Sequence, residues 1–204
     1  MKEDILEQLV DDYLQTKGYF TRRNVKFKPR REHESWDLKK DSNHSDIDVI
    51  GFNPHLRGAA RVMAVSCKSW QAGFHIRAKL DELENQKVRS GREVWKAFRE
   101  LMEPKWTEGF FDAVLEHAGT TKFTYMTAVT AIRGGDRKLW EQHPRFQNAL
   151  RGNPIKIISF ADMVTQVLAG LNTTLAPSDL ARTLQLLKAA GIPLEDRVSK
   201  AHAT

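Results

Sequence analysis

The chain contains a single cysteine, Cys67, among its 204 residues. One cysteine excludes an internal disulfide framework and a zinc site built from several thiolates. The seven histidines lie far apart, with no pair at the i, i+4 spacing of a helical zinc site. No apolar run approaches the roughly 18 residues that a membrane span requires, and the charged first residues are not typical of a signal peptide. These absences predict a cytoplasmic protein.

Glycine-rich phosphate-binding motifs are also missing. Gly134 and Gly135 separate a predicted strand from a predicted helix, but the stretch matches neither G-x-x-x-x-G-K-[ST] nor G-x-G-x-x-G. We interpret it as a tight turn capped by Asp136. A serine nucleophile at Ser66 is also disfavoured, because a serine inside a strand lacks the strained turn that presents such a nucleophile.

Positive charge is abundant and unevenly distributed. The formal net charge is +6, and a short segment near the N-terminus is markedly basic. Two interpretations of this segment stay open: a solvated loop, or an edge that contacts the phosphates of a nucleic acid. The residues concerned are Arg22, Arg23, Lys26, Lys28, Arg30 and Arg31.

Apolar periodicity and turn residues predict alternating helices and strands. The predicted strands are 19–27, 46–52, 60–70, 123–132 and 155–160. The predicted helices are 3–17, 76–102 with a break near residue 90, 110–117, 136–150, 161–171 and 178–190. This order indicates an α/β fold with a mixed central sheet flanked by helices. We expect one domain over 1–171, with a helical insertion at about 89–119, and a C-terminal helical appendage over 172–204.

Charged residues stand on two neighbouring strands of this predicted sheet. Strand alternation places Asp46 and Asp48 on one face near the start of the first strand, and Ser66 and Lys68 on one face near the end of the second. If the strands pair antiparallel, the end of one lies beside the start of the other. A carboxylate and a lysine would then meet at one edge of the sheet. This is costly on apolar strands unless the charges are paired or used.

With these residues the chain resembles the PD-(D/E)xK nuclease superfamily, in particular its Holliday-junction-resolvase and Mrr-like members. That superfamily has a helix with a glutamate, a strand with an aspartate, and a following strand that ends in (D/E)-x-K. Glu7 matches the helical glutamate, Asp48 in "SDIDVIGF" the aspartate, and Lys68 in "AVSCKSW" the lysine. The resemblance covers roughly residues 1–90 in detail, and it implies a restriction-endonuclease-like fold.

The sequence departs from the motif at Ser66, which stands where the acidic residue of (D/E)-x-K is expected. A subset of type II restriction enzymes also has Ser-x-Lys, with the carboxylate supplied by the next helix about 13 residues after the lysine. By this resemblance Glu82 would supply it, with Glu84, Asp81 and Asp46 as alternatives.

The resemblance implies a metal-dependent DNA endonuclease. Asp48 and Glu82 would hold Mg²⁺ or Mn²⁺, Lys68 would assist at the scissile phosphate, and Glu7 would complete the site. The substrate is expected to be double-stranded DNA, contacted by the basic segment and by Gln71. Many such nucleases dimerise to cut both strands, so a homodimer is a further expectation. Two alternatives stay open: a catalytically inactive nuclease-fold DNA-binding protein, and a protein-interaction module in which Asp48 and Lys68 form a structural pair.

Overall fold

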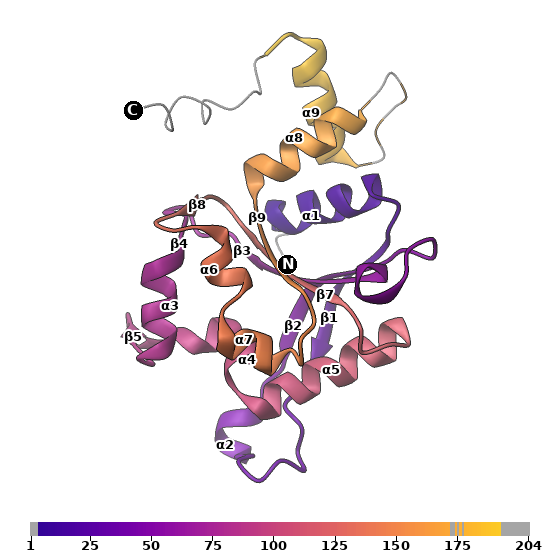
Figure 1. Ribbon diagram of the computed structural model, residues 1–204. Helices are drawn as coiled ribbons and strands as arrows, with labels where there is room; N and C mark the ends of the chain where they lie inside the picture. The colour runs from indigo at the N-terminus through magenta and orange to yellow at the C-terminus, as the bar shows by residue number, and fades with distance from the viewer. Residues whose placement is uncertain (1–3, 172–173, 175, 177, 193–204) are drawn as a thin grey trace.

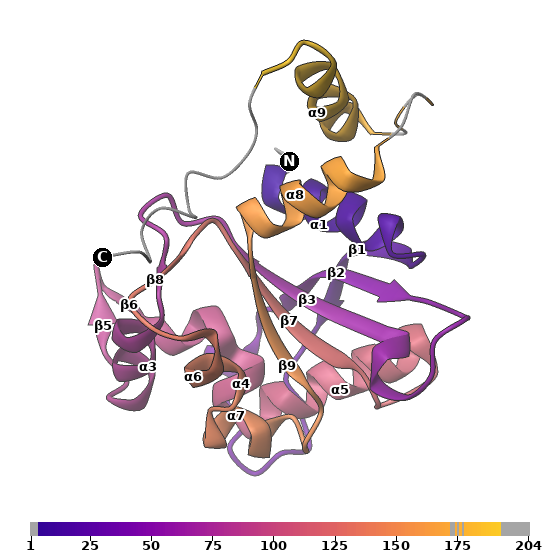
Figure 2. The same ribbon diagram turned by 45° about the horizontal axis from the view of Figure 1, so that its top comes forward.

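The computed structural model describes residues 4–171, 174, 176 and 178–192. Its centre is a five-stranded mixed sheet in the order β1-β2-β3-β7-β9 (Figures 1 and 2). The first three strands are antiparallel neighbours, and β3, β7 and β9 run parallel. The predicted mixed α/β fold with a central sheet flanked by helices is therefore confirmed. The sheet strands are β1 (Phe20–Phe27), β2 (Ser45–Phe52), β3 (Val62–Lys68), β7 (Thr124–Val129) and β9 (Ile155–Ser159).

Helices cover both faces of this sheet (Figure 1). One face carries α1 (Ile5–Thr16) and α8 (Phe160–Gly170), with α9 (Asp179–Ala189) packed against both. The opposite face carries five further helices of the described residues. They are α3 (Ile76–Glu84), α4 (Arg99–Met102), α5 (Pro104–Ala118), α6 (Arg137–Glu141) and α7 (Pro144–Ala149).

Two hydrophobic cores follow from these two layers. The α1-side core contains Leu9, Val49 and Met163. The α5-side core is larger and contains Trp106 and Phe110, together with many other aromatic residues. The segment expected as a helical insertion at 89–119 therefore contributes an integral layer of the fold. Of the expected appendage, α9 is described, whereas residues 193–204 lie outside the described residues.

The break predicted near residue 90 within the helical segment 76–102 is confirmed, but the residues around it are not helical. After α3 the chain turns back through a small hairpin of β5 (Val88–Arg89) and β6 (Arg92–Glu93). Ser90 and Gly91 form its turn with φ of 48° and 73°, which helix geometry does not permit. A 3₁₀ helix, η2 (Val94–Phe98), then leads into α4.

Strand and helix bounds differ from the predictions in other places too. Residues 58–61 form a short 3₁₀ helix, η1 (Gly58–Arg61), before β3 begins. Strand β7 ends early, and β8 (Ile132–Arg133) pairs separately with β4 (Phe74–His75). The helix expected over 136–150 with a kink at Pro144 is divided at that residue, which begins α7.

Helix α5 is longer than the predicted 110–117, because Pro104 begins it and does not interrupt it. Proline at the first helical position leaves no intrahelical hydrogen bond unmade. Gly109, inside this helix, is explained by packing: a Cβ atom there would lie 1.8 Å from the carbonyl oxygen of Lys28. The end of β1 thus lies directly on the backbone of α5.

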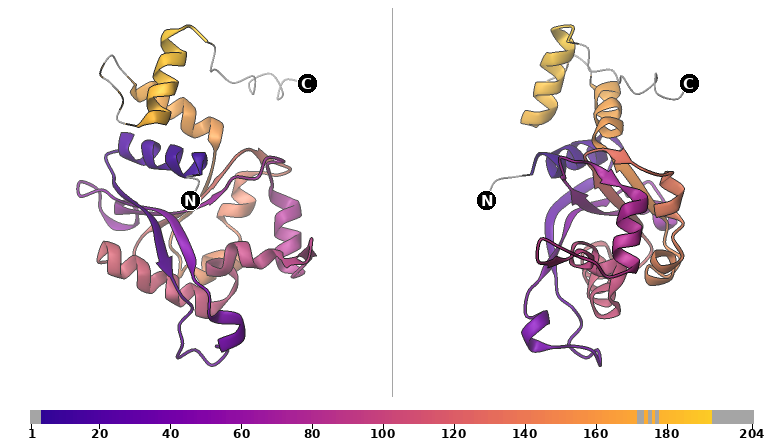
Figure 3. Two further views of the ribbon diagram at one scale, coloured as in Figure 1. Left: turned by 180° about the vertical axis from the view of Figure 1, so that it is seen from behind. Right: turned by 90° about the vertical axis from the view of Figure 1, so that its left-hand side faces the viewer.

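The connection between β1 and β2 projects beyond the sheet and carries α2 (Leu38–Asp41) (Figure 3). A buried ion pair fixes it to α5, with Lys105 Nζ 2.7 Å from Asp41 Oδ2. Lys105 also donates to the carbonyl oxygen of Ser35. In the described part of the chain, no helix is both long and apolar enough to cross a membrane.

We predict that Gly109→Ala lowers the free energy of unfolding by about 3 kcal/mol, because the new methyl group displaces the Lys28 backbone. Alanine is otherwise the better helix former. Gly170→Ala in α8 is the matched control, since its Cβ would meet only ordinary contacts beyond 3.6 Å with Thr16. Denaturant unfolding measures both variants. Equal stabilities would contradict the packing argument.

Candidate active site

The ladder between β2 and β3 ends at the pair Val49 and Val65. Directly beyond it, Asp48 Oδ2 accepts a hydrogen bond of 2.5 Å from the backbone N–H of Cys67. Lys68 Nζ donates to Ser66 Oγ at 2.8 Å. The antiparallel pairing predicted for the hairpin is thus confirmed, and it brings Asp48, Ser66 and Lys68 to one corner of the sheet.

The alternation of β2 is interrupted at this corner. Ile47 and Ile50 pack in the α5-side core, whereas Val49 packs in the α1-side core. In a regular strand residues 47 and 49 would share a face. On β1, Asn24 stands opposite the interruption with a φ of 55°. The simple alternation that predicts a shared face for Asp46 and Asp48 therefore does not hold here.

Glu7 reaches the same corner from α1. Asp4 caps this helix by accepting from the N–H of Leu6, and it accepts a 2.6 Å hydrogen bond from Ser69 Oγ at the end of β3. The first turn of α1 is thereby joined to the strand that carries Lys68. Among the charges that raise the pKa of Glu7, Asp48 contributes most. The structure thus places Glu7, Asp48 and Lys68 together, as expected from the sequence.

The carboxyl groups of this corner hold their protons unusually strongly. The pKa of Asp48 is raised to about 6, chiefly by burial and further by Glu100 and Asp46, whereas Lys68 and the Cys67 N–H lower it. Burial, Asp48 and Asp4 raise the pKa of Glu7 to about 7. Acidic groups therefore outweigh the two cations that act on these carboxyl groups, Lys68 on Asp48 and Arg23 on Glu7.

Glu82 is engaged elsewhere. Its carboxylate lies 2.6 Å from Lys79 Nζ and 2.9 Å from Arg89 Nε, and these two cations lower its pKa despite burial. The alternatives on α3 are also bonded: Asp81 is paired with Lys87, and Glu84 lies 3.0 Å from the ring of His143. Asp46 lies 3.4 Å from Lys26 Nζ. Glu82 is not one of the charged groups that contribute most to the pKa of Asp48.

Glu100 is the carboxylate that the sequence reasoning missed. It stands on α4, is only 5% exposed, and accepts a 2.5 Å hydrogen bond from the hydroxyl of the fully buried Tyr125. Its charge raises the pKa of Asp48. The available signal was weak: Glu100 lies between Phe98 and Leu101-Met102, but Arg99 and Glu103 make the same stretch look like an exposed helix.

The predicted nucleic-acid contacts divide into two groups. Arg22, Lys28, Arg31 and Gln71 are exposed. Arg30 instead makes a bidentate contact with Asp112 at 2.6 and 3.0 Å. The remaining two also contact acidic groups: Arg23 lies 3.7 Å from Asp11, and Lys26 lies near His44 and Asp46.

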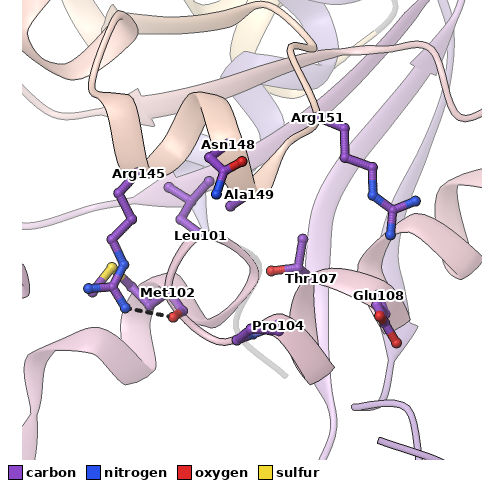
Figure 4. A pocket seen from close by; sticks show the side chains of 9 residues that line it. All are labelled: Leu101, Met102, Pro104, Thr107, Glu108, Arg145, Asn148, Ala149 and Arg151. Carbon is purple, nitrogen blue, oxygen red and sulfur yellow. Dashed lines mark hydrogen bonds between the residues drawn. The ribbon is translucent and has the colours of Figure 1, made fainter.

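A pocket of about 340 Å³ opens between α4, α5 and α7, with Arg145 and Arg151 on its rim (Figure 4). Glu7, Asp48 and Lys68 line neither this pocket nor the pockets of about 620 and 360 Å³. These three pockets therefore lie apart from the candidate corner.

The described residues contain no group of three or more Asp, Glu, His or Cys side chains placed to hold a metal ion. The donor chemistry of the corner nevertheless suits a hard divalent cation, which prefers carboxylate oxygens. The raised pKa values of Asp48 and Glu7 are the observation in favour of this, because a cation between them would relieve their repulsion.

No protein-family model, no curated protein and no solved structure matches the chain.

We predict that Glu7→Gln stabilises the protein at pH 8.5 in buffer without divalent cations. The folded-state pKa of Glu7 lies above its ordinary value, so the folded state binds more protons between about pH 4.5 and 7. The free energy of unfolding therefore falls as the pH rises through this range. Each pKa unit corresponds to about 1.4 kcal/mol, and partial exposure reduces the expected gain to about 1 kcal/mol.

Chemical denaturation at pH 5 and pH 8.5 measures this gain, which should appear only at the higher pH. Glu116→Gln is the control, because Glu116 is an exposed glutamate of α5. The same gain at both pH values would contradict the electrostatic explanation.

Proposed function

We propose that the protein is a metal-dependent nuclease that hydrolyses phosphodiester bonds in double-stranded DNA. The observation that carries the proposal is the meeting of Asp48, Lys68 and Glu7 where β2 and β3 separate, with two of the three pKa values displaced. Strongly perturbed carboxyl groups beside a lysine are typical of functional sites. Further support comes from the order of α1, β2 and β3, which is that of the PD-(D/E)xK superfamily.

The residues of the corner have distinct roles in this proposal. Asp48 and Glu7 would hold Mg²⁺ or Mn²⁺, which supplies Lewis-acid polarisation of the scissile phosphate when bound. Lys68 places an ammonium group beside them and stabilises the negative charge that develops on phosphate oxygens. Asp48 is fixed in this position by the Cys67 N–H.

Basic residues outside the corner are in keeping with a polymeric substrate. Many of the contacts to a long duplex are made to its phosphate backbone. The exposed cations Lys28 and Arg31 stand on the projecting β1–β2 connection, which the Lys105–Asp41 ion pair holds on α5. A fixed basic extension of this kind provides phosphate contacts away from the catalytic corner.

We predict that the native protein cleaves supercoiled plasmid with Mg²⁺ or Mn²⁺, and that Asp48→Asn and Lys68→Met lower the rate by about 10²–10³-fold. DNA affinity should stay close to native in both variants, because neither residue belongs to the basic extension. Glu82→Gln should cut at a near-native rate, since Lys79 and Arg89 occupy its carboxylate.

Loss of cleavage in Glu82→Gln, with its fold and DNA affinity intact, would restore Glu82 as the second carboxylate. A four-way junction and linear DNA serve as additional substrates. If none is cut with either ion while DNA still binds, the protein is instead a DNA-binding protein of nuclease fold.

We predict that Lys28→Ala with Arg31→Ala weakens DNA binding and reduces the slope of log K against log salt concentration. Each lost phosphate contact changes that slope by about 0.9, so the double variant should lose about 2. Lys156→Ala, an exposed lysine on the opposite edge strand β9, is the control. Fluorescence anisotropy at several salt concentrations measures both. An unchanged slope would place the DNA on another surface.

A further inference from the structure

The segments that follow β3 and β7 are joined to each other beyond the carboxyl ends of these two parallel strands. The first segment forms β4 and the second forms β8, and the two pair in parallel. The N–H of Phe74 donates to the carbonyl oxygen of Ala131 at 2.7 Å. The N–H of Arg77 donates to the carbonyl oxygen of Gly134 at 3.3 Å. Open α/β sheets bind ligands at the carboxyl ends of their parallel strands, and Lys68 ends β3 at this edge.

Two exposed arginines stand on these paired segments, residues 73–77 and 131–135, which we call the β4–β8 edge. Arg133 lies on β8 opposite His75 of β4, and Arg77 follows two residues after His75. Within the described part of the chain, neither guanidinium group forms an ion pair or a hydrogen bond. The acid that follows in the sequence, Asp136, accepts from the backbone N–H of Lys138 as the cap of α6. The edge therefore presents two cations that no described carboxylate neutralises.

Each of these arginines packs on a glycine of the opposite segment. A Cβ atom at Gly73 would lie 2.9 Å from Nε of Arg133, and one at Gly135 would lie 3.3 Å from Cγ of Arg77. Gly73 also has a φ of 81°, which favours glycine. The two side chains thus lie directly on backbone. Such packing reduces the conformational entropy that an arginine loses when it binds a ligand.

Packed aromatic rings connect the β4–β8 edge to the candidate corner. Lys68 Nζ lies 5.2 Å from the centroid of the Phe98 ring, and that ring lies 6.1 Å from the ring of Phe74, the first residue of β4. Trp70, which lies between Lys68 and β4 in the sequence, stacks on Phe74 with an interplanar angle of 4°. These contacts hold the edge near Lys68. In Figure 1 the edge lies well away from α2, which belongs to the projecting β1–β2 connection.

We propose that Arg77 and Arg133 bind phosphate groups of the DNA strand that lies at Lys68, on a surface separate from the basic extension with Lys28 and Arg31. A guanidinium group binds phosphate oxygens through two parallel hydrogen bonds. Each strand of a duplex carries one phosphate per about 3.4 Å of helix axis. A strand that passes Lys68 therefore presents further phosphates to this edge. This inference rests on the proposed function for its substrate, double-stranded DNA.

The test is DNA binding by the double variant Arg77→Gln with Arg133→Gln. Fluorescence anisotropy of a labelled duplex measures it at several salt concentrations, in buffer without divalent cations. Glutamine keeps most of each aliphatic stem and removes the charge. Each lost phosphate contact reduces the slope of log K against log salt concentration by about 0.9, so we expect a loss of about 2. Arg57→Gln with Lys156→Gln is the matched control, because it removes two exposed cations elsewhere and should keep the native slope.

Two further variants distinguish charge and position from other causes. Arg77→Lys with Arg133→Lys keeps both charges and should keep the native slope. The glutamine pair combined with Lys28→Ala and Arg31→Ala should lose about twice as much slope as either pair alone, since separate surfaces contribute additively. The proposal is overturned if the glutamine pair binds DNA like the control. It is also overturned if the lysine pair loses as much slope as the glutamine pair.

Cleavage of supercoiled plasmid separates this inference from the proposed function. If the glutamine pair loses slope and the native protein does not cut, the phosphate-binding edge stands and the nuclease activity fails. If the native protein cuts and the glutamine pair binds and cuts like the control, the activity stands and the edge is overturned. If the native protein does not bind DNA at all, both are overturned.

Discussion

The arrangement of this corner depends on one hydrogen bond, from the Cys67 N–H to the Asp48 carboxylate. This hydrogen bond takes the place of the next backbone hydrogen bond of the β2–β3 ladder, so the two strands separate there. The separation gives Lys68 and Ser66 room at the end of β3, and the first turn of α1 reaches the same place. The burial of a carboxylate costs free energy unless a positive charge or donors compensate. The pKa of Asp48 is raised because burial and the charges of Glu100, Asp46 and Glu7 outweigh the effects of Lys68 and the Cys67 N–H. A purely structural corner would be more stable with an apolar side chain here, and this favours a functional role for the charge.

The two faces of the sheet contribute different chemistry to the corner. The α1 side supplies Glu7, joined to β3 through Asp4 and Ser69. The α5 side supplies Glu100 and Tyr125, held by the rigid packing of α4 on α5. Asp48 lies between them, at the interruption of β2. The elements that hold these groups are packed in two separate cores, which fix the groups from both faces of the sheet. Such preorganisation is what electrostatic catalysis requires, since the dipoles and charges need not rearrange during the reaction.

Short-range sequence patterns predict where Asp48, Lys68 and Glu7 lie. They do not predict the positions of Glu100 and Glu82. Antiparallel pairing of β2 and β3 brings Asp48 and Lys68 to one corner, and Glu7 lies in the first turn of α1. These are short-range patterns. Glu100 reaches the corner only because the chain reverses in a hairpin at Ser90 and Gly91 and does not continue as a second helix there. Glu82, at a suitable offset from Lys68, is held by Lys79 and by Arg89, which the turn at Gln86 after α3 brings near it. The interruption of β2 at Asp48 likewise depends on Asn24 of the neighbouring strand, which no pattern within β2 indicates.

The serine at position 66 is then consistent with its surroundings. A carboxylate there would be a further buried negative charge beside Asp48 and Glu100, in a corner where Asp48 already has a raised pKa. A hydroxyl group accepts the hydrogen bond from Lys68 Nζ without adding a charge. Serine therefore gives the lysine at the end of β3 a hydrogen-bond acceptor and leaves the number of acidic groups around Asp48 unchanged.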